Sequence, residues 1–130
     1  MAGSAFRAAV EAQDLDAATA LLGDDVTFNS PVVHRPYAGK ETVATILRTA
    51  FRVFEDFHYT DELEADGVHA LIFRAHVGDR ELQGLDLVRT DEQGRIVDFT
   101  VMVRPASGLM ALAERMGTGL AEAGITPPGR

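Results

Sequence analysis

Asp86 is the residue whose type and setting point most clearly to chemistry. Alternation over residues 80–90 places it on the same side of a strand as Leu82 and Val88. If that side faces the interior, as we predict, the carboxyl group lies among apolar side chains and desolvation raises its pKa. Such a group could serve as an acid or hydrogen-bond donor. The alternative is an exposed aspartate, or one paired with a nearby base.

His34 is the second candidate for catalysis, as a base at the mouth of a pocket. It lies in a loop between Pro31 and Pro36, and the pKa of a free histidine, about 6.5, suits a base. A solvent-exposed loop histidine is the alternative. Tyr37 could offer its hydroxyl to the same pocket or pack beneath the loop. We therefore predict Asp86 and His34 as the catalytic residues.

The predicted substrate-binding wall is mainly apolar and aromatic. It consists of Phe6, Ser30, Tyr37, Phe73, Val88, Phe99, Val101 and Val103. No metal site is predicted, because His58, His69 and His76 do not have metal-ligand spacing beside a third ligand. We expect these histidines on a polar or interfacial sheet face, and no cofactor is implied. Arg104 could clamp an anionic substrate group or pair with a surface carboxylate.

A mixed α+β chain must position these residues. Helices are predicted after Ser4, from Asp14 to Gly23, and at 41–54 and 107–123. Strands are predicted at 26–30, 57–65, 68–77, 80–90 and 95–104, the last four separated by glycine-containing turns. The last four form a curved antiparallel meander with three helices on one side. Its concave face must be filled by helices, large side chains or a ligand.

Four short motifs follow one another in a distinctive order: Asp14–Asp16, Leu21–Pro31, Pro36–Lys40 and Gly94–Asp98. Together they resemble ketosteroid isomerases and the SnoaL-like polyketide cyclases, members of the nuclear transport factor 2 superfamily. The similarity covers roughly residues 5–104. It implies an NTF2-like cone, a curved antiparallel sheet packed on N-terminal helices around an internal pocket. We expect one such domain over residues 1–125, with an extra C-terminal helix, and a flexible tail at 126–130.

The resemblance implies roles for three positions, and two of them have lost the corresponding chemistry. The aspartate base of ketosteroid isomerase corresponds to Ser30, and its oxyanion-hole tyrosine corresponds to Phe6. Neither an unactivated serine nor a phenyl ring replaces those groups. The second oxyanion-hole donor, a protonated aspartate, corresponds to Asp86. This pattern argues against ordinary ketosteroid isomerase activity.

Composition limits the class of protein further. Twelve basic and twenty acidic residues give a net charge of −8, which disfavours nucleic-acid binding. The absence of cysteine excludes disulfides and thiolate chemistry and suits a reducing compartment. No apolar run is long enough to span a membrane, and the N-terminus lacks a signal-peptide core. We therefore expect a cytoplasmic protein.

Three functional hypotheses remain open. The first is a cofactor-independent isomerase, cyclase or hydrolase that acts on an apolar, polyketide-like or steroid-like carbonyl compound, with Asp86 as acid or donor. The second is a binding or accessory protein that has kept the pocket without the chemistry. The third is a structural homodimer that pairs through the convex sheet face, which carries Ile72, Thr100 and Met102. The helix at 107–123 either covers the pocket mouth or extends the dimer contact.

Overall fold

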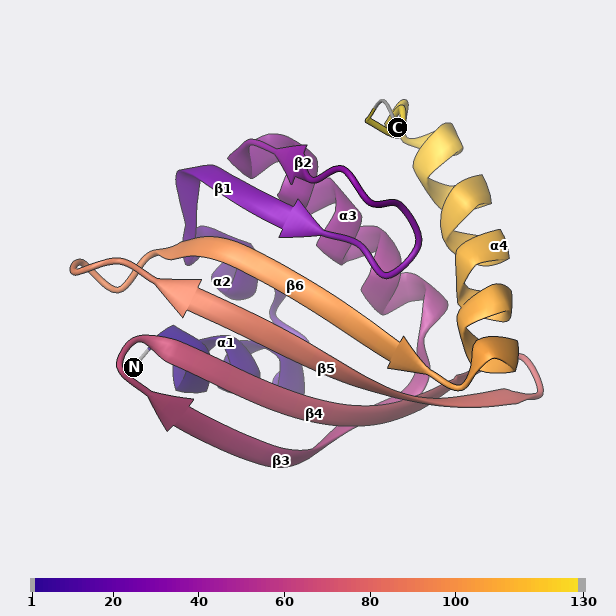
Figure 1. Ribbon diagram of the computed structural model, residues 1–130, viewed down its shortest axis with the longest axis horizontal. Coiled ribbons are helices and arrows are strands. Elements are labelled where there is room, and N and C mark those ends of the chain that lie inside the picture. Colours follow the sequence, from indigo (N-terminus) through magenta and orange to yellow (C-terminus); the bar gives the residue numbers. More distant parts are fainter. Residues whose placement is uncertain (1, 129–130) are drawn as a thin grey trace.

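A curved six-stranded sheet is the frame of this computed structural model, which describes residues 2–128 (Figure 1). Its strands are β1 (Leu22–Asn29), β2 (Tyr37–Ala38), β3 (Glu55–Ala65), β4 (Val68–Val77), β5 (Arg80–Thr90) and β6 (Ile96–Arg104). The helices of the described residues are α1 (Ala2–Glu11), α2 (Leu15–Ala20), α3 (Lys40–Val53) and α4 (Ala106–Glu122). The strand order across the sheet is β2-β1-β6-β5-β4-β3. The fold is therefore α+β, as predicted.

The predicted meander forms the larger part of the sheet. β4 and β5 have the predicted bounds and pair without interruption from Val68 opposite Arg89 to Val77 opposite Arg80. Their connecting turn contains Gly78, whose φ of 60° lies in the left-handed region that glycine adopts without strain. The glycine signals in the sequence thus identify the hairpins correctly, because they mark backbone conformations that few other residues accept.

The sheet is wider than the predicted four-stranded meander. β1 adds to it in parallel with β6, with Phe28 opposite Phe99, and β2 pairs with β1 in turn. β1 also starts at Leu22, so Gly23 lies within a strand instead of ending the second helix. The sequence does not predict this pairing, because parallel strands are not joined by a tight turn and β6 lies far from β1 along the chain.

The helices pack against one face of the sheet, which we call the inner face and which carries Phe73, Asp86 and Phe99 (Figure 1). α2 begins as predicted, with the carboxylate of Asp14 accepting a hydrogen bond from the Ala17 backbone N–H at 3.0 Å. α3 buries its apolar stripe, which includes Ile46. The opposite side of the sheet is the outer face.

α4 follows β6 and packs along α3. The contact is close at Gly119, where an added Cβ would lie 2.7 Å from the Cγ2 atom of Thr49. Glycine at this position therefore lets the two helices approach each other, although it lowers the intrinsic helix propensity of α4. The helix continues through Gly117 and Gly119, as the sequence analysis expected.

Aromatic rings fill much of the space between helices and sheet. Phe6 of α1 meets Phe99 of β6 edge-on, with ring centroids 5.2 Å apart. Phe57 and Phe73 stack on neighbouring strands at 4.7 Å. A Cβ at Gly84, opposite Phe73 on β5, would collide with the Phe73 ring. These contacts fix the strands that carry the candidate site.

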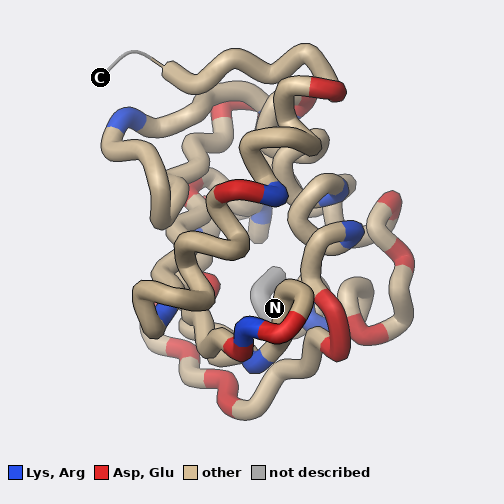
Figure 2. Tube along the Cα trace, turned by 90° about the vertical axis from the view of Figure 1, so that its right-hand side faces the viewer, with Lys and Arg blue, Asp and Glu red and all other residues tan. Residues whose placement is uncertain are grey.

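Charged side chains are distributed around the molecule, with both signs intermixed along the trace (Figure 2). Those near the N-terminal helix form a small cluster in which Arg7 pairs with Glu11 and with Glu62, both at 3.2 Å. Among the described residues, no helix is both long and apolar enough to cross a membrane.

Candidate functional site

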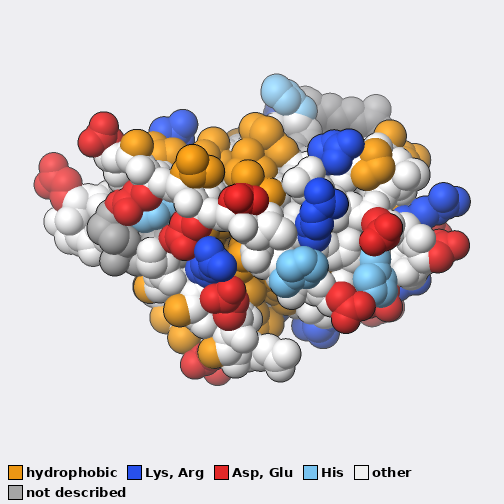
Figure 3. All heavy atoms as spheres, turned by 90° about the horizontal axis from the view of Figure 1, so that it is seen from below, with side chains coloured by type: hydrophobic (Ala, Val, Ile, Leu, Met, Phe, Trp, Pro, Cys, Tyr) orange, Lys and Arg blue, Asp and Glu red, His pale blue; other side chains and the backbone are white. Residues whose placement is uncertain are grey.

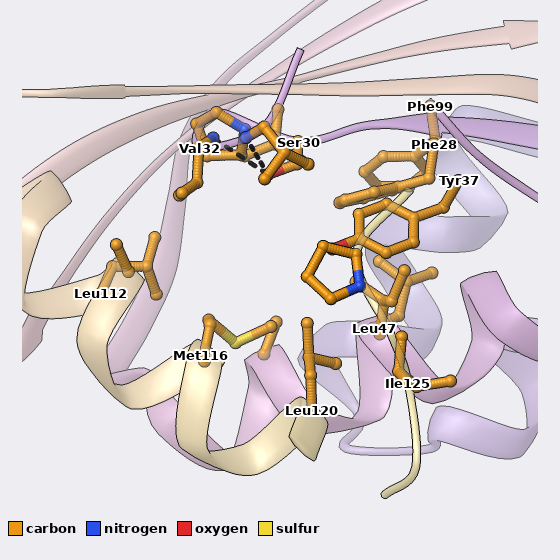
Figure 4. Close-up of a pocket in the computed structure, with 18 of the residues that line it drawn as sticks. Phe28, Ser30, Val32, Tyr37, Leu47, Phe99, Leu112, Met116, Leu120 and Ile125 are labelled. Carbon is orange, nitrogen blue, oxygen red and sulfur yellow. Dashed lines mark hydrogen bonds between the residues drawn. The ribbon is translucent and has the colours of Figure 1, made fainter. Parts of the chain in front are cut away.

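An apolar pocket of about 210 Å³ lies between the inner face of the sheet, the loop after β1, and helices α3 and α4 (Figure 4). Its aromatic lining residues are Phe28, Tyr37, Phe51, Phe54, Phe57 and Phe99. In Figure 4, Leu112, Met116 and Leu120 project from α4 into the same space. Such a lining excludes water and favours an apolar ligand.

Asp86 is the carboxyl group that lines this pocket. Its side chain lies on the inner face, between Leu71 of β4 and Val101 of β6, and is only 4% exposed. Burial raises the pKa of Asp86 from 3.8 to about 7, although a hydrogen bond from Tyr59 opposes the rise. Near neutral pH the carboxyl group is thus present in both protonated and ionised forms, and the protonated form can donate a hydrogen bond into the pocket.

Tyr59 is the functional neighbour that the sequence analysis did not identify. Its hydroxyl donates a hydrogen bond to Oδ2 of Asp86 at 3.3 Å, and its side chain is 7% exposed. The alternation of Phe57 and Tyr59 with polar residues was a usable signal for an inward-facing strand. The ladder shifts its register between Tyr59 and Asp61, so alternation does not continue along β3 and the signal is short.

Four of the residues predicted as substrate-binding also line the pocket: Ser30, Tyr37, Phe99 and Val101. The Ser30 hydroxyl accepts hydrogen bonds from the backbone N–H groups of Val32 at 2.9 Å and Val33 at 3.4 Å (Figure 4). It therefore closes the turn that follows β1, and its proton remains able to point toward a ligand. Burial raises the pKa of Tyr37, which keeps its phenol protonated.

The side chain of His34 is exposed and does not line the pocket, contrary to the prediction of a base at its mouth. The loop contributes Pro31, Val32 and Val33 to the lining. Apolar side chains lower the free energy by facing the cavity, whereas the imidazole remains hydrated. The structure thus brings Asp86, and not His34, to the pocket.

Four other predicted wall residues lie outside the lining: Phe6, Phe73, Val88 and Val103. The first three are fully buried, and they fill the core beneath the residues that form the wall. Val103 is partly buried and packs against the same core. Alternation predicts their inward direction correctly, but it cannot separate a cavity wall from the solid core behind it.

The strand histidines differ from one another. His69 is 1% exposed and lies on the inner face with Leu71, which corrects the expectation of a polar or interfacial face. Its Nδ1 atom has no hydrogen-bond partner among the described residues. His58 is exposed, and the Nε2 atom of His76 lies 2.7 Å from Oδ2 of Asp56 at the surface.

Arg104 donates a hydrogen bond to Oε1 of Gln83 at 3.2 Å, away from the pocket.

The outer face of the sheet carries a mixture of apolar and polar side chains. Met102 is 52% exposed and lines a shallow groove with Ile72 and Leu85. Thr100 on the same strand hydrogen-bonds Asn29 and Asp98. The β3 side of the molecule, which Figure 3 views from below Figure 1, likewise carries apolar side chains among charged ones and histidines. Pairing of two copies through the outer face stays a prediction.

The predicted tail begins within the described residues and ends beyond them. Pro127 lines the pocket, as does Ile125 just before the tail, beside Leu120 of α4. Residues 129 and 130 lie outside the described residues. α4 and the segment after it therefore cover one side of the pocket, which is one of the two roles considered for this helix.

Comparison with solved structures identifies close relatives of this arrangement. A steroid delta-isomerase from Pseudomonas aeruginosa is 48% identical, with a TM-score of 0.87 over 94% of this chain and 93% of that chain. A protein with a cystatin-like fold from Silicibacter pomeroyi is 30% identical, with a TM-score of 0.86 over 91% and 84% of the two chains. An NTF2-like protein from Mesorhizobium loti, 18% identical with a TM-score of 0.67 over 77% and 85%, shares the fold.

Comparison by sequence agrees with the comparison of structures. No curated protein matches the chain. Residues 4–99 match the SnoaL-like domain, and the match includes β1, α3 and the strand that carries Asp86. The chain therefore belongs to the SnoaL-like family and has the NTF2-like fold that the family resemblance implied.

Proposed function

We propose that the chain binds an apolar, carbonyl-containing molecule of the polyketide or steroid kind in the pocket, and that protonated Asp86 donates a hydrogen bond to its carbonyl oxygen. The observation that carries the proposal is a buried carboxyl group, with a pKa of about 7, in an otherwise apolar lining. The similarity to the steroid delta-isomerase supports a ligand of this kind.

The hydrogen bond would do more than hold the ligand. In a pocket that excludes water, a donor aimed at a carbonyl oxygen stabilises the negative charge that develops when an α-proton leaves. Asp86 would share or transfer its proton to the forming enolate, and reprotonation at another carbon would complete an isomerisation. An enolate that attacks a second carbonyl of the same molecule would complete a cyclisation instead.

The base of this scheme comes from outside the protein side chains that line the pocket. Among the described residues that line the pocket, Asp86 is the only carboxyl group and there is no imidazole. The α-proton would then pass to water or to a group of the ligand itself. We therefore propose ligands whose α-protons are already acidic, since these need the least help from a protein base.

A non-catalytic ligand-binding protein is the second candidate function. It is favoured by Ser30 at the position of the family base, since its hydroxyl oxygen is engaged by two backbone N–H groups. It is also favoured by Phe6, which is buried in the core instead of offering a hydroxyl to the pocket. In this case Asp86 would orient the carbonyl compound without converting it.

Deuterium exchange distinguishes the two candidates. The protein is incubated in D₂O with a 5-ene-3-ketosteroid and, separately, with 2-tetralone, and exchange of the α-protons is followed by mass spectrometry. A catalyst accelerates exchange, and Asp86→Ala, which leaves no side-chain donor at this position, reduces the acceleration about 100-fold, the usual loss when an oxyanion donor is removed. The matched control is Asp24→Ala, the same substitution at an exposed position of β1.

Binding is measured in parallel by titration calorimetry. Binding with no accelerated exchange would select the ligand-binding alternative. Failure of both compounds to bind would contradict the proposed function itself. Equal exchange rates for the unmodified protein and Asp86→Ala would remove Asp86 from the mechanism.

A further inference from the structure

The two carboxylate oxygens of Asp86 have different surroundings. Oδ2 accepts the hydrogen bond from the Tyr59 hydroxyl at 3.3 Å. Oδ1 has no hydrogen-bond partner within residues 2–128. Asp86 lines the pocket, whereas Tyr59 does not. The hydroxyl of Tyr59 therefore approaches the carboxyl group from the core and not from the ligand's side.

The ring of Tyr59 is held on several sides. Phe57 meets it edge-on, with centroids 4.9 Å apart and planes at 88°. The guanidinium carbon of Arg7 lies 5.7 Å from its centroid on another side. Arg7 is itself held by Glu11 and Glu62, each at 3.2 Å. A ring packed in this way cannot turn freely, so its hydroxyl keeps one direction.

The direction of the hydrogen bond follows from the acidities of the two groups. Burial raises the pKa of Tyr59, and the nearby charge of ionised Asp86 raises it further, so the phenol keeps its proton. Tyr59 is therefore the donor, and Oδ2 of Asp86 is the acceptor, whether Asp86 is protonated or not. An oxygen that already accepts a hydrogen bond is the carbonyl oxygen of a neutral carboxyl group, so the acid proton is favoured on the other oxygen.

We propose that Tyr59 is a positioning residue that occupies Oδ2 of Asp86 and so assigns the acid proton to Oδ1, the oxygen available to a ligand's carbonyl. This inference rests on the proposed function for what the proton does to a ligand. The hydrogen bond from Tyr59 to Asp86, on which the inference is based, does not depend on a ligand. Tyr59 thereby sets both the direction of the donor and the pH at which the donor is lost.

The pH effect has a definite sign. A hydrogen bond from Tyr59 stabilises the ionised carboxylate more than the neutral acid, so it lowers the pKa of Asp86 against the effect of burial. Removing the hydroxyl must therefore raise the pKa of Asp86. The donor then persists to higher pH, but its proton can occupy either oxygen and its direction is less defined.

The test is a direct titration of Asp86 by NMR, in protein labelled with carbon-13 at the aspartate carboxyl groups. In Tyr59→Phe, which keeps the ring, we expect the pKa of Asp86 to rise by about one unit. The matched control is Tyr37→Phe, which removes the phenol that lines the pocket and is expected to leave the pKa of Asp86 unchanged. An unchanged pKa in Tyr59→Phe, or an equal rise in Tyr37→Phe, would overturn the proposal.

A second substitution keeps the proposal testable if Tyr59→Phe does not fold. Replacement of Tyr59 by 3-fluorotyrosine keeps the shape of the residue and makes its hydroxyl a stronger donor. The pKa of Asp86 should then fall, the opposite sign to Tyr59→Phe, and a rise or no change would contradict the inference. Because these titrations need no ligand, their failure is distinct from a failure of either ketone to bind.

The expected change in ligand binding follows from the same titrations. In the unmodified protein, affinity for 2-tetralone should fall as pH rises through about 7, where Asp86 loses its proton. In Tyr59→Phe this fall should move upward by about one pH unit, by the same amount as the pKa. A structural role for Tyr59 alone would weaken binding equally at every pH, and that result would count against the proposal.

Discussion

Asp86 and Asp98 lie on neighbouring strands and point to opposite faces of the sheet, and their surroundings differ sharply. Asp86 is on the inner face, with Tyr59 as its hydrogen-bond donor at 3.3 Å. Asp98 is on the outer face and accepts hydrogen bonds from Thr27 at 2.6 Å, Asn29 at 3.1 Å and Thr100 at 3.3 Å. Burial in the apolar wall pushes the carboxyl group of Asp86 toward its neutral form, whereas Asp98 accepts hydrogen bonds from three side-chain donors. Side-chain neighbours therefore decide which aspartate is a structural acceptor and which can act as an acid.

The largest expected effect is on the pH dependence of stability. The pKa of Asp86 is raised by folding from 3.8 to about 7, so the folded protein retains a proton that the unfolded chain has lost. The stability that this proton contributes is complete below about pH 4 and is lost as pH rises to about 7, at about 1.4 kcal/mol per unit and about 4 kcal/mol in all. Urea unfolding from pH 4 to 8 measures the difference from Asp86→Asn.

Asp98→Asn is the control for this measurement. Its difference from the unmodified protein should not follow the titration of Asp86, because the inner carboxyl group is unchanged. If Asp86→Asn and the unmodified protein keep a constant stability difference from pH 4 to 8, the buried acid is not protonated in the folded protein.

A smaller effect is expected when Asp98 loses its side chain. Asp98→Ala removes the acceptor 2.6 Å from the Thr27 hydroxyl and one of the two side-chain acceptors of the Asn29 amide, which keeps Thr100, at a cost of about 2 kcal/mol in the free energy of unfolding. The rate of deuterium exchange in a bound ketone should stay unchanged, since Asp98 is on the other face. Urea unfolding and the exchange assay measure the two quantities. A loss of exchange that exceeds the loss of folded protein would disagree with this separation.

The smallest expected effect tests whether the number of hydrogen-bond donors accounts for the difference between the surroundings of Asp86 and Asp98. Val101 lies directly opposite Asp86 on β6 and lines the pocket. Val101→Asn would give Asp86 an amide donor like the one that Asn29 gives Asp98, and should lower the pKa of Asp86 by about one unit. The pH-dependent part of the stability should shrink by about 1.4 kcal/mol. Val101→Leu is the matched control without a donor, and NMR titration of Asp86 is the measurement.

The sequence was most informative where one rule acts over a short range. Alternation along residues 80–90 correctly placed Asp86 on the inner face, because the β4–β5 ladder has no bulge. The motifs that resemble the SnoaL-like family correctly identified the fold, since they include the turns and caps that define it. Asp14, for example, caps α2 as its position in the sequence suggested.

Long-range packing limited the rest of the prediction. The parallel pairing of β1 with β6 depends on residues far apart in the sequence, and no local pattern encodes it. The register shift between Tyr59 and Asp61 shortens the alternating pattern on β3, so the sequence did not identify Tyr59 as the partner of Asp86. The exposure of His34 depends on which side of a loop faces a cavity, and composition cannot show that. These features become visible only when the strands and helices are assembled.

The acid of the pocket and the side chains of α4 come from different elements of the fold. Its acid comes from β5, whereas Leu112, Met116 and Leu120 project from α4, which adjoins α3 through Gly119. Substitutions in α4 can therefore change the size and shape of the pocket without altering the groups around Asp86. Under the proposed function, the fit of a ligand and the chemistry at Asp86 would thus depend on different elements, so that evolution or protein design could exchange one while retaining the other.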